Sequence, residues 1–207
     1  MSDKEKRIIK ATLELREGDG GARSFRGYAA IFNQPSVDMG FIETVAPGAF
    51  KRTLAANPDV IANIQHEGGL STIGRTKNGT LTLSTDDVGL LVDITPPDTQ
   101  AGRDALMLVS GGYVDQMSFA FMVKEHDWRK EDDQLFRTLL DVELDGGDVA
   151  IVTGPAYPQT TVEVRAEAAA LSEAGDDAID EAEEAARLEA QRANRKRRYQ
   201  ILKERTK

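Results

Sequence analysis

The run Gln116-Met117-Ser118-Phe119-Ala120-Phe121-Met122-Val123 has the pattern of a buried β-strand that carries a single serine. Alternate side chains of a strand point to opposite faces. One face of this strand is therefore predicted to be wholly apolar, formed by Met117, Phe119, Phe121 and Val123. Ser118 lies on the other face beside Ala120, so we expect it to be rigidly backed and open on its own side. A serine held in this way can act as a nucleophile if a base reaches it.

His66 is the candidate base, and it is one of only two histidines in the chain. It follows the run Val60-Ile61-Ala62-Asn63-Ile64-Gln65, which predicts a short strand. In that strand His66 would continue the face of Val60, Ala62 and Ile64, just before a turn at Gly68-Gly69. An imidazole there could take the proton of Ser118. Taken alone, the pair also has a simpler interpretation, because a single serine or histidine more often serves only packing.

A carboxylate that orients the histidine is the third group that such a site needs. Asp148 stands at the entrance of a strand predicted at residues 149–153, where it could do this, but it could equally be a turn residue after Gly146-Gly147. Rival carboxylates are Glu67, Asp115, Asp141 and Glu143. The second histidine, His126, is flanked by charged residues and is expected to be exposed rather than catalytic.

The composition restricts the classes of protein that this chain can belong to. Its 207 residues include no cysteine, which excludes disulfides and thiolate metal sites, and the presence of only two histidines argues against a histidine-rich metal site. A net charge of -9 argues against a general nucleic-acid binder. No apolar run approaches membrane-spanning length, and the start MSDKEKRIIK does not resemble a signal peptide. We expect a soluble cytoplasmic protein without a cofactor or a metal site.

Short strand-like runs separated by turn signals dominate the chain up to residue 165. Strands are predicted at residues 8–15, 25–32, 60–65, 80–84, 89–94, 117–123, 135–144 and 149–153. Lys77-Asn78-Gly79 predicts a hairpin, and Asp86-Asp87 and Glu131-Asp132-Asp133 also suggest hairpin turns. Helices are predicted only at residues 46–54 and 99–109. This pattern predicts a mainly β fold, an antiparallel barrel or sandwich with peripheral helices.

The composition changes near Arg165 and divides the chain into three parts. Residues 1–24 form an N-terminal segment with a first strand, residues 25–165 form the β domain, and residues 166–207 form a tail. The tail is rich in Ala, Glu and Arg, has no proline, and changes from acidic to basic along its length. It is predicted to be helical or partly disordered and to bury little apolar surface. Its charge pattern also suits docking to a partner.

Several short motifs, in this order, resemble the prohead proteases of tailed bacteriophages. They are Arg26-Gly27-Tyr28-Ala29-Ala30-Ile31-Phe32-Asn33, Glu43-Thr44-Val45-Ala46-Pro47-Gly48-Ala49-Phe50, Thr72-Ile73-Gly74-Arg75, Asp86-Asp87-Val88-Gly89-Leu90, Met117-Ser118-Phe119-Ala120-Phe121 and Pro155-Ala156-Tyr157. Together they cover residues 25–165, and they are specific as a set. One departure is that Gln65 and Glu67 flank His66 where the family often has Asn and Asp.

The resemblance implies an assemblin-like antiparallel β-barrel, related to the herpesvirus assemblin proteases and ringed by helices. It also implies the roles of the site residues: His66 matches the family histidine, Ser118 the family serine, and Asp148 the acidic third position. An oxyanion or substrate loop is expected after the last strand. Because Pro155 has no N–H, the donors there would be Gly154, Ala156 or Tyr157.

The function that the resemblance implies is that of a serine endopeptidase of capsid maturation. Such an enzyme would cleave the scaffold, or the scaffolding segment of the major capsid protein, and itself, inside the immature head in the cytoplasm of the infected bacterium. Neither membrane binding nor direct nucleic-acid binding is expected, and such an enzyme could form a homo-oligomer. The tail would serve as a packaging signal. The alternative is a catalytically inactive scaffold protein that keeps the fold. The joint presence of His66 and Ser118 favours the enzyme.

Overall fold

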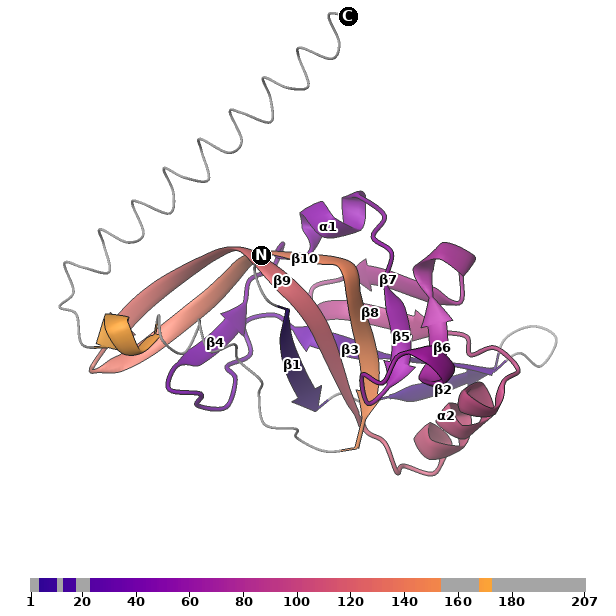
Figure 1. The fold of residues 1–207 in the computed structure, drawn as a ribbon. Coiled ribbons are helices and arrows are strands. Elements are labelled where there is room, and N and C mark those ends of the chain that lie inside the picture. The colour runs from indigo at the N-terminus through magenta and orange to yellow at the C-terminus, as the bar shows by residue number, and fades with distance from the viewer. Residues whose placement is uncertain (1–3, 11–12, 18–22, 154–167, 173–207) are drawn as a thin grey trace, which may run out of the picture.

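The structure, a computed structural model, describes residues 4–10, 13–17, 23–153 and 168–172 (Figure 1). The strands are β1 Glu5–Lys10, β2 Glu14–Glu17, β3 Arg23–Ile31, β4 Ile42–Val45, β5 Ile61–Ile64, β6 Thr72–Arg75, β7 Leu81–Thr85, β8 Gly89–Ile94, β9 Gln116–Glu131 and β10 Gln134–Val152. The helices are α1 Lys51–Ala55 and α2 Gln100–Ser110, with 3-10 turns η2 Gly69–Ser71 and η3 Thr76–Asn78. Residues 168–172 are also helical. In this part of the chain, no helix is both long and apolar enough to cross a membrane.

The mainly β prediction is confirmed, and the strands pair into two sheets rather than one closed barrel. One sheet has the order β1-β9-β10-β5-β6, with β4 paired farther along β10, and the other has the order β2-β3-β8-β7. The two sheets share one apolar core. The predicted apolar face of β9 lies in it, because Met117, Phe119 and Phe121 are all buried there. Ser118 is thereby directed to the opposite face of the sheet.

β9 and β10 are longer than predicted and form a hairpin arm that reaches away from the two sheets (Figure 1). The two predicted strands at 135–144 and 149–153 are one strand interrupted by a bulge. Along the arm lies a second apolar cluster, formed by Phe41, Trp128, Leu135, Ala168 and Leu171. The expectation that the tail buries little apolar surface therefore does not hold for residues 168–172, where Ala168 and Leu171 are buried.

A buried network of charges, which the sequence analysis did not find, fastens β1 and β4 to β10. The Arg137 guanidinium donates from Nη1 to Oε2 of Glu5 at 2.9 Å and to Oε2 of Glu43 at 3.0 Å. Arg7 also pairs with both carboxylates. Two cations thus balance two anions, which buried charges require. Because β1 pairs with β9 at Ser118, this network also holds one neighbour of the serine strand.

The predicted turns had different outcomes. Hairpins at Asp86-Asp87 and Asp132-Asp133 are confirmed as the connections β7–β8 and β9–β10. Asp132 and Asp133 both have positive φ, as a tight hairpin turn requires. The prediction of a hairpin at Lys77–Gly79 was wrong, because η3 leads from β6 in one sheet to β7 in the other. The local turn forms, with Gly79 at φ +75, but tertiary packing separates the flanking strands.

Both predicted helices are present, although one is shorter than expected. α2 matches its prediction, and the Thr99 side chain caps it by accepting a hydrogen bond from the Gly102 N–H at 3.2 Å. The first helix begins only at Lys51, because residues 47–50 form a turn instead.

Candidate active site

Ser118 lies on the face of β9 that is turned away from the main core. Its backbone neighbours are Ile8 on β1 and Ala150 on β10, and Ala150 in turn pairs with Asn63 on β5. The prediction that Ser118 is open was wrong, because it is 0% exposed. A small side chain between two neighbouring strands, with the His66 ring against its Oγ, has no surface left for solvent.

His66 reaches Ser118 from a turn rather than from a strand face. β5 ends at Ile64, and Gln65 and His66 both have positive φ, 56° and 60°. His66 therefore does not continue the predicted face of β5. Two consecutive non-glycine residues in this region are strained, and such strain often marks functional sites. The turn is held by Gln65, whose N–H donates to the Ile151 carbonyl at 3.0 Å and whose Nε2 donates to Thr153 Oγ1 at 2.7 Å.

A bulge in β10 decides where Asp148 points. The register with β9 shifts between Glu143 and Asp148, after which Asp148 lies opposite Ala120. Gly146 adopts φ +67 in the bulge, and a Cβ on Gly147 would lie only 2.2 Å from the Ala120 carbonyl oxygen. Bulges commonly redirect a side chain next to active sites. Here the bulge directs the Asp148 carboxylate towards the His66 turn.

The three predicted residues form one hydrogen-bonded chain. His66 Nε2 lies 2.6 Å from Ser118 Oγ, and His66 Nδ1 lies 2.7 Å from Asp148 Oδ2. Burial raises the pKa of Asp148, but hydrogen bonding and charge from His66, the amide of Asn63 and the charge of Lys6 outweigh it and lower that pKa. Asp148 is therefore ionised near neutral pH and can only accept, so Nδ1 carries the proton and Nε2 is free to accept from Ser118.

The rival carboxylates either bind Arg52 or are exposed. Asp141 and Glu143 both accept hydrogen bonds from Arg52, at 2.6 Å and 2.8 Å. Burial raises the pKa of Glu143, but its bonds to Arg52 and Thr53 outweigh this and lower it to about 2. Glu67 and Asp115 are exposed.

The remaining predicted positions do not join this chain of hydrogen bonds. His126 is half-buried rather than exposed, and its Nδ1 accepts from Arg137 Nε at 2.8 Å. Gly154, Ala156 and Tyr157, the expected oxyanion donors, lie outside the described residues.

Asn63 also binds Asp148, and the sequence did not lead us to expect this contact. Its Nδ2 donates to Asp148 Oδ2 at 2.7 Å. A signal was present, since Asn63 is the one polar residue inside the apolar run from Val60 to Ile64. A polar side chain in the middle of a buried strand needs a partner.

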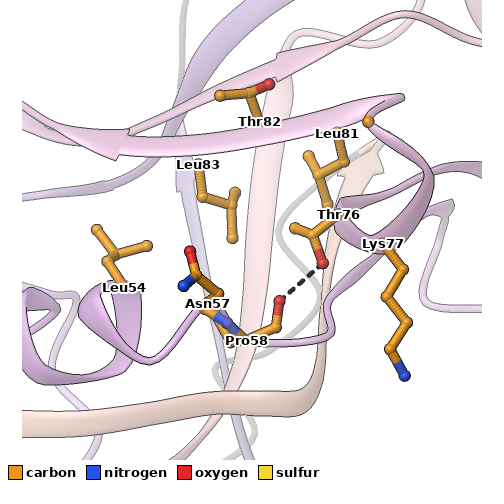
Figure 2. Close-up of a pocket in the computed structure, with 9 residues that line it drawn as sticks. Leu54, Asn57, Pro58, Thr76, Lys77, Leu81, Thr82 and Leu83 are labelled. Carbon is orange, nitrogen blue, oxygen red and sulfur yellow. Dashed lines mark hydrogen bonds between the residues drawn. The ribbon is translucent and has the colours of Figure 1, made fainter.

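A groove of about 390 Å³ lies elsewhere, between the end of α1 and the edge strand β7 (Figure 2). Leu54, Leu81 and Leu83 provide its apolar wall, and Thr76 Oγ1 donates to the Pro58 carbonyl at 2.7 Å beside it. None of the three predicted site residues lines this groove.

Comparison with known proteins decides the family. Residues 10–174 match the sequence model of the caudovirus prohead serine proteases, which is most of the chain. The chain belongs to the caudovirus prohead serine protease family. This prohead protease is therefore a peptidase of the serine class, as the resemblance implied. No curated protein matches its sequence.

A solved structure shares the fold of this prohead protease. It is the bacteriophage T4 capsid assembly protease, gp21, which is 9% identical, with a TM-score of 0.50. The match covers 74% of this chain and 99% of that chain. At such low identity the likeness concerns the fold alone.

Proposed function

We propose that this prohead protease is an endopeptidase that uses Ser118 as nucleophile, His66 as general base and Asp148 as the orienting acid. The observation that carries the proposal is the unbroken chain of contacts Ser118 Oγ to His66 Nε2, 2.6 Å, and His66 Nδ1 to Asp148 Oδ2, 2.7 Å. Nucleophile, base and orienting group at these distances are the arrangement that serine-dependent acyl transfer uses.

The chemistry follows from the proton positions. As Ser118 Oγ attacks a peptide carbonyl carbon, its proton moves to His66 Nε2, and the imidazolium that forms is stabilised by the Asp148 carboxylate. His66 then gives the proton to the leaving amine, which leaves an acyl group on Ser118. Water attacks that ester, losing its proton to His66, which returns it to Ser118 Oγ as the acid leaves. The oxyanion of each tetrahedral intermediate needs backbone N–H donors, for which Gly154, Ala156 and Tyr157 are our candidates.

The burial of Ser118 adds a requirement to this proposal. A substrate carbonyl cannot reach a serine with no exposed surface. The side chains or the segment that cover Ser118 must therefore move before the acyl step, as in many enzymes whose sites close around their substrates.

The proposed substrates are the scaffold, or the scaffolding segment of the major capsid protein, and the protease itself. Membership of the caudovirus prohead serine protease family supports this assignment, because a prohead is an assembling head. The proposed site of action is the immature head in the cytoplasm of the infected bacterium. The charged tail is proposed to dock the protease to the shell or scaffold.

The test is co-expression of the full chain with its capsid precursor, followed by mass spectrometry of the precursor. Ser118→Ala and His66→Ala should each lower the rate of precursor cleavage by several orders of magnitude, because the residues of a catalytic triad act as a unit. The matched controls are Ser110→Ala, at an exposed serine of α2, and His126→Gln, which keeps an acceptor for Arg137 at the second histidine. Both controls should process the precursor. Processing by Ser118→Ala at the wild-type rate would exclude the proposed nucleophile.

A further inference from the structure

A side chain outside the predicted triad shares the carboxylate oxygen that orients His66. Asp148 Oδ2 accepts from Asn63 Nδ2 at 2.7 Å and lies 2.7 Å from His66 Nδ1. Asn63 is only 3% exposed. Its donor therefore acts in a site largely removed from water, where a hydrogen bond to a charged group has its greatest effect.

The sheet itself fixes this contact. Asn63 lies on β5 and pairs with Ala150 on β10, while Asp148 is two residues earlier on β10. Residues two apart on a strand share a face, so Asn63 and Asp148 are diagonal neighbours on the same surface of the sheet. Ala150 pairs with Asn63 on one side and with Ser118 on the other, so these three residues lie side by side across the sheet.

The other half of the Asn63 amide points to a role beyond packing. Its Oδ1 is buried and has no hydrogen-bond partner among the described residues. Turning the amide over would put this oxygen against the Asp148 carboxylate, so the Nδ2 donor must face Asp148. A buried acceptor without a partner is unfavourable, and an apolar side chain of similar size would avoid it.

We propose that Asn63 is a positioning residue that keeps the Asp148 carboxylate ionised and turned towards His66. The inference rests on the proposed function of the triad. An N–H donor favours the charged form of a carboxylate, and it also restricts rotation of the carboxylate plane. Without Asn63, Asp148 Oδ2 would have one donor fewer, and the Nδ1–H tautomer of His66 would be held less firmly.

The experiment measures the rate at which a fluorophosphonate probe labels Ser118 in the full-length chain, with the labelled residue identified by mass spectrometry. In that reaction Ser118 Oγ displaces fluoride from phosphorus, so the rate depends on access to the serine and on its activation, and the cleavage site need not be known. The variants are Asn63→Leu, Asp148→Asn and the double variant. Thr138→Val, which removes a hydroxyl on the arm strand β10, is the control for loss of a polar group.

We expect Asn63→Leu to label about 10- to 100-fold more slowly, by analogy with the loss of an outer hydrogen-bond partner around a metal-bound histidine. Its urea-unfolding midpoint should stay at or above the wild-type value, because the unpaired oxygen is removed as well. In the Asp148→Asn background the same change should alter the rate by less than about 2-fold, since residues that act through each other are not additive. Thr138→Val should label at the wild-type rate.

Asn63→Asp gives an independent test should Asn63→Leu fail to fold. Two carboxylates at this distance share one proton, which restores a donor at acid pH. Its labelling rate relative to wild type should therefore fall as the pH rises from 5 to 9. A wild-type labelling rate for Asn63→Leu, equal losses in both backgrounds, or a relative rate of Asn63→Asp that is independent of pH would each overturn the proposal. Failure of the wild-type chain both to label at Ser118 and to process the capsid precursor would instead refute the proposed function.

Discussion

Replacing Gly147 by alanine tests whether the bulge in β10 holds the site together. The added Cβ would lie 2.2 Å from the carbonyl oxygen of Ala120 and 2.9 Å from that of Leu144. Real Cβ contacts closer than 3.0 Å are essentially never seen. Both obstacles are backbone atoms, so no side-chain rotation relieves the clash. The β10 bulge must therefore shift, and β9 must move away from it at Ala120, next to Asp148 and two residues from Ser118.

The distances set the size of the effect. Restoring an allowed contact requires a displacement of at least 0.8 Å between the two strands. A misplacement of about 1 Å in a catalytic arrangement can cost about 100-fold in rate. Overpacking of a buried position also costs about 1–3 kcal/mol of unfolding free energy. We therefore expect Gly147→Ala to remain folded but to label Ser118 with the fluorophosphonate probe about 100-fold more slowly.

The neighbouring glycine provides a matched control. Gly146 has φ +67, but a Cβ there meets nothing within 4 Å. Asparagine tolerates this backbone conformation better than most residues. Gly146→Asn should therefore lose less than about 1 kcal/mol of stability and keep its labelling rate within about 2-fold of wild type. Urea unfolding followed by circular dichroism would establish that both variants are folded under the labelling conditions.

A wild-type labelling rate for folded Gly147→Ala would refute this reasoning. The bulge would then not control the relation of Asp148 to Ser118. An equal loss for Gly146→Asn would also contradict it, because disruption of the bulge backbone, rather than displacement of β9, would be the cause.

Five further changes have defined expectations. Asp148→Asn should slow precursor cleavage about 10⁴-fold, less than the loss of Ser118, since an orienting group supports the base without reacting; a silent change would reassign the third member. Arg137→Met leaves a buried carboxylate unbalanced and should lower the urea-unfolding free energy by about 3–5 kcal/mol, and a loss below about 1 kcal/mol would contradict this. Because the pKa of Glu143 is lowered in the folded protein, its contribution to stability is complete above pH 4.5 and is lost as the pH falls towards 2. The difference in unfolding free energy between wild type and Glu143→Gln should therefore shrink over that range. A difference that stays constant would contradict this expectation. Leu171→Ala should cost about 2 kcal/mol in urea, and a chain ending at residue 165 at least as much, whereas unchanged unfolding would show that the arm does not need the helix at 168–172.

Much of the local structure could be predicted because it depends on neighbouring residues. The alternation in residues 116–123 identified both the core face of β9 and the exceptional serine, since side-chain direction in a strand has period 2. The turns at Asp86-Asp87 and Asp132-Asp133 were found because aspartate favours turns: Asp86 Oδ1 accepts from the N–H groups of Val88 and Gly89, and Asp132 and Asp133 adopt positive φ. Lys77–Gly79 shows the limit of such reasoning, because its turn forms although its flanking strands pair with other partners.

The location of His66 shows why part of the site could not be predicted. A strand pattern extended past Ile64 puts His66 on the wrong face, and only the positive φ of Gln65 and His66 brings the ring across to Ser118. Those angles are held by bonds from Gln65 to Ile151 and Thr153, which are far away in the sequence.

The sequence by itself determined a mainly β chain and named Ser118, His66 and Asp148 as the residues to bring together. The tertiary structure decided how they meet, because the bulge at Gly146-Gly147 sets the register of Asp148 against β9. It also showed the contact of Asn63 with the Asp148 carboxylate, and the Arg137 network that holds β1 in place. The physical reason is that alternation and turn chemistry act between residues close in the chain, whereas a hydrogen bond between strands depends on a register that only the packed sheet specifies.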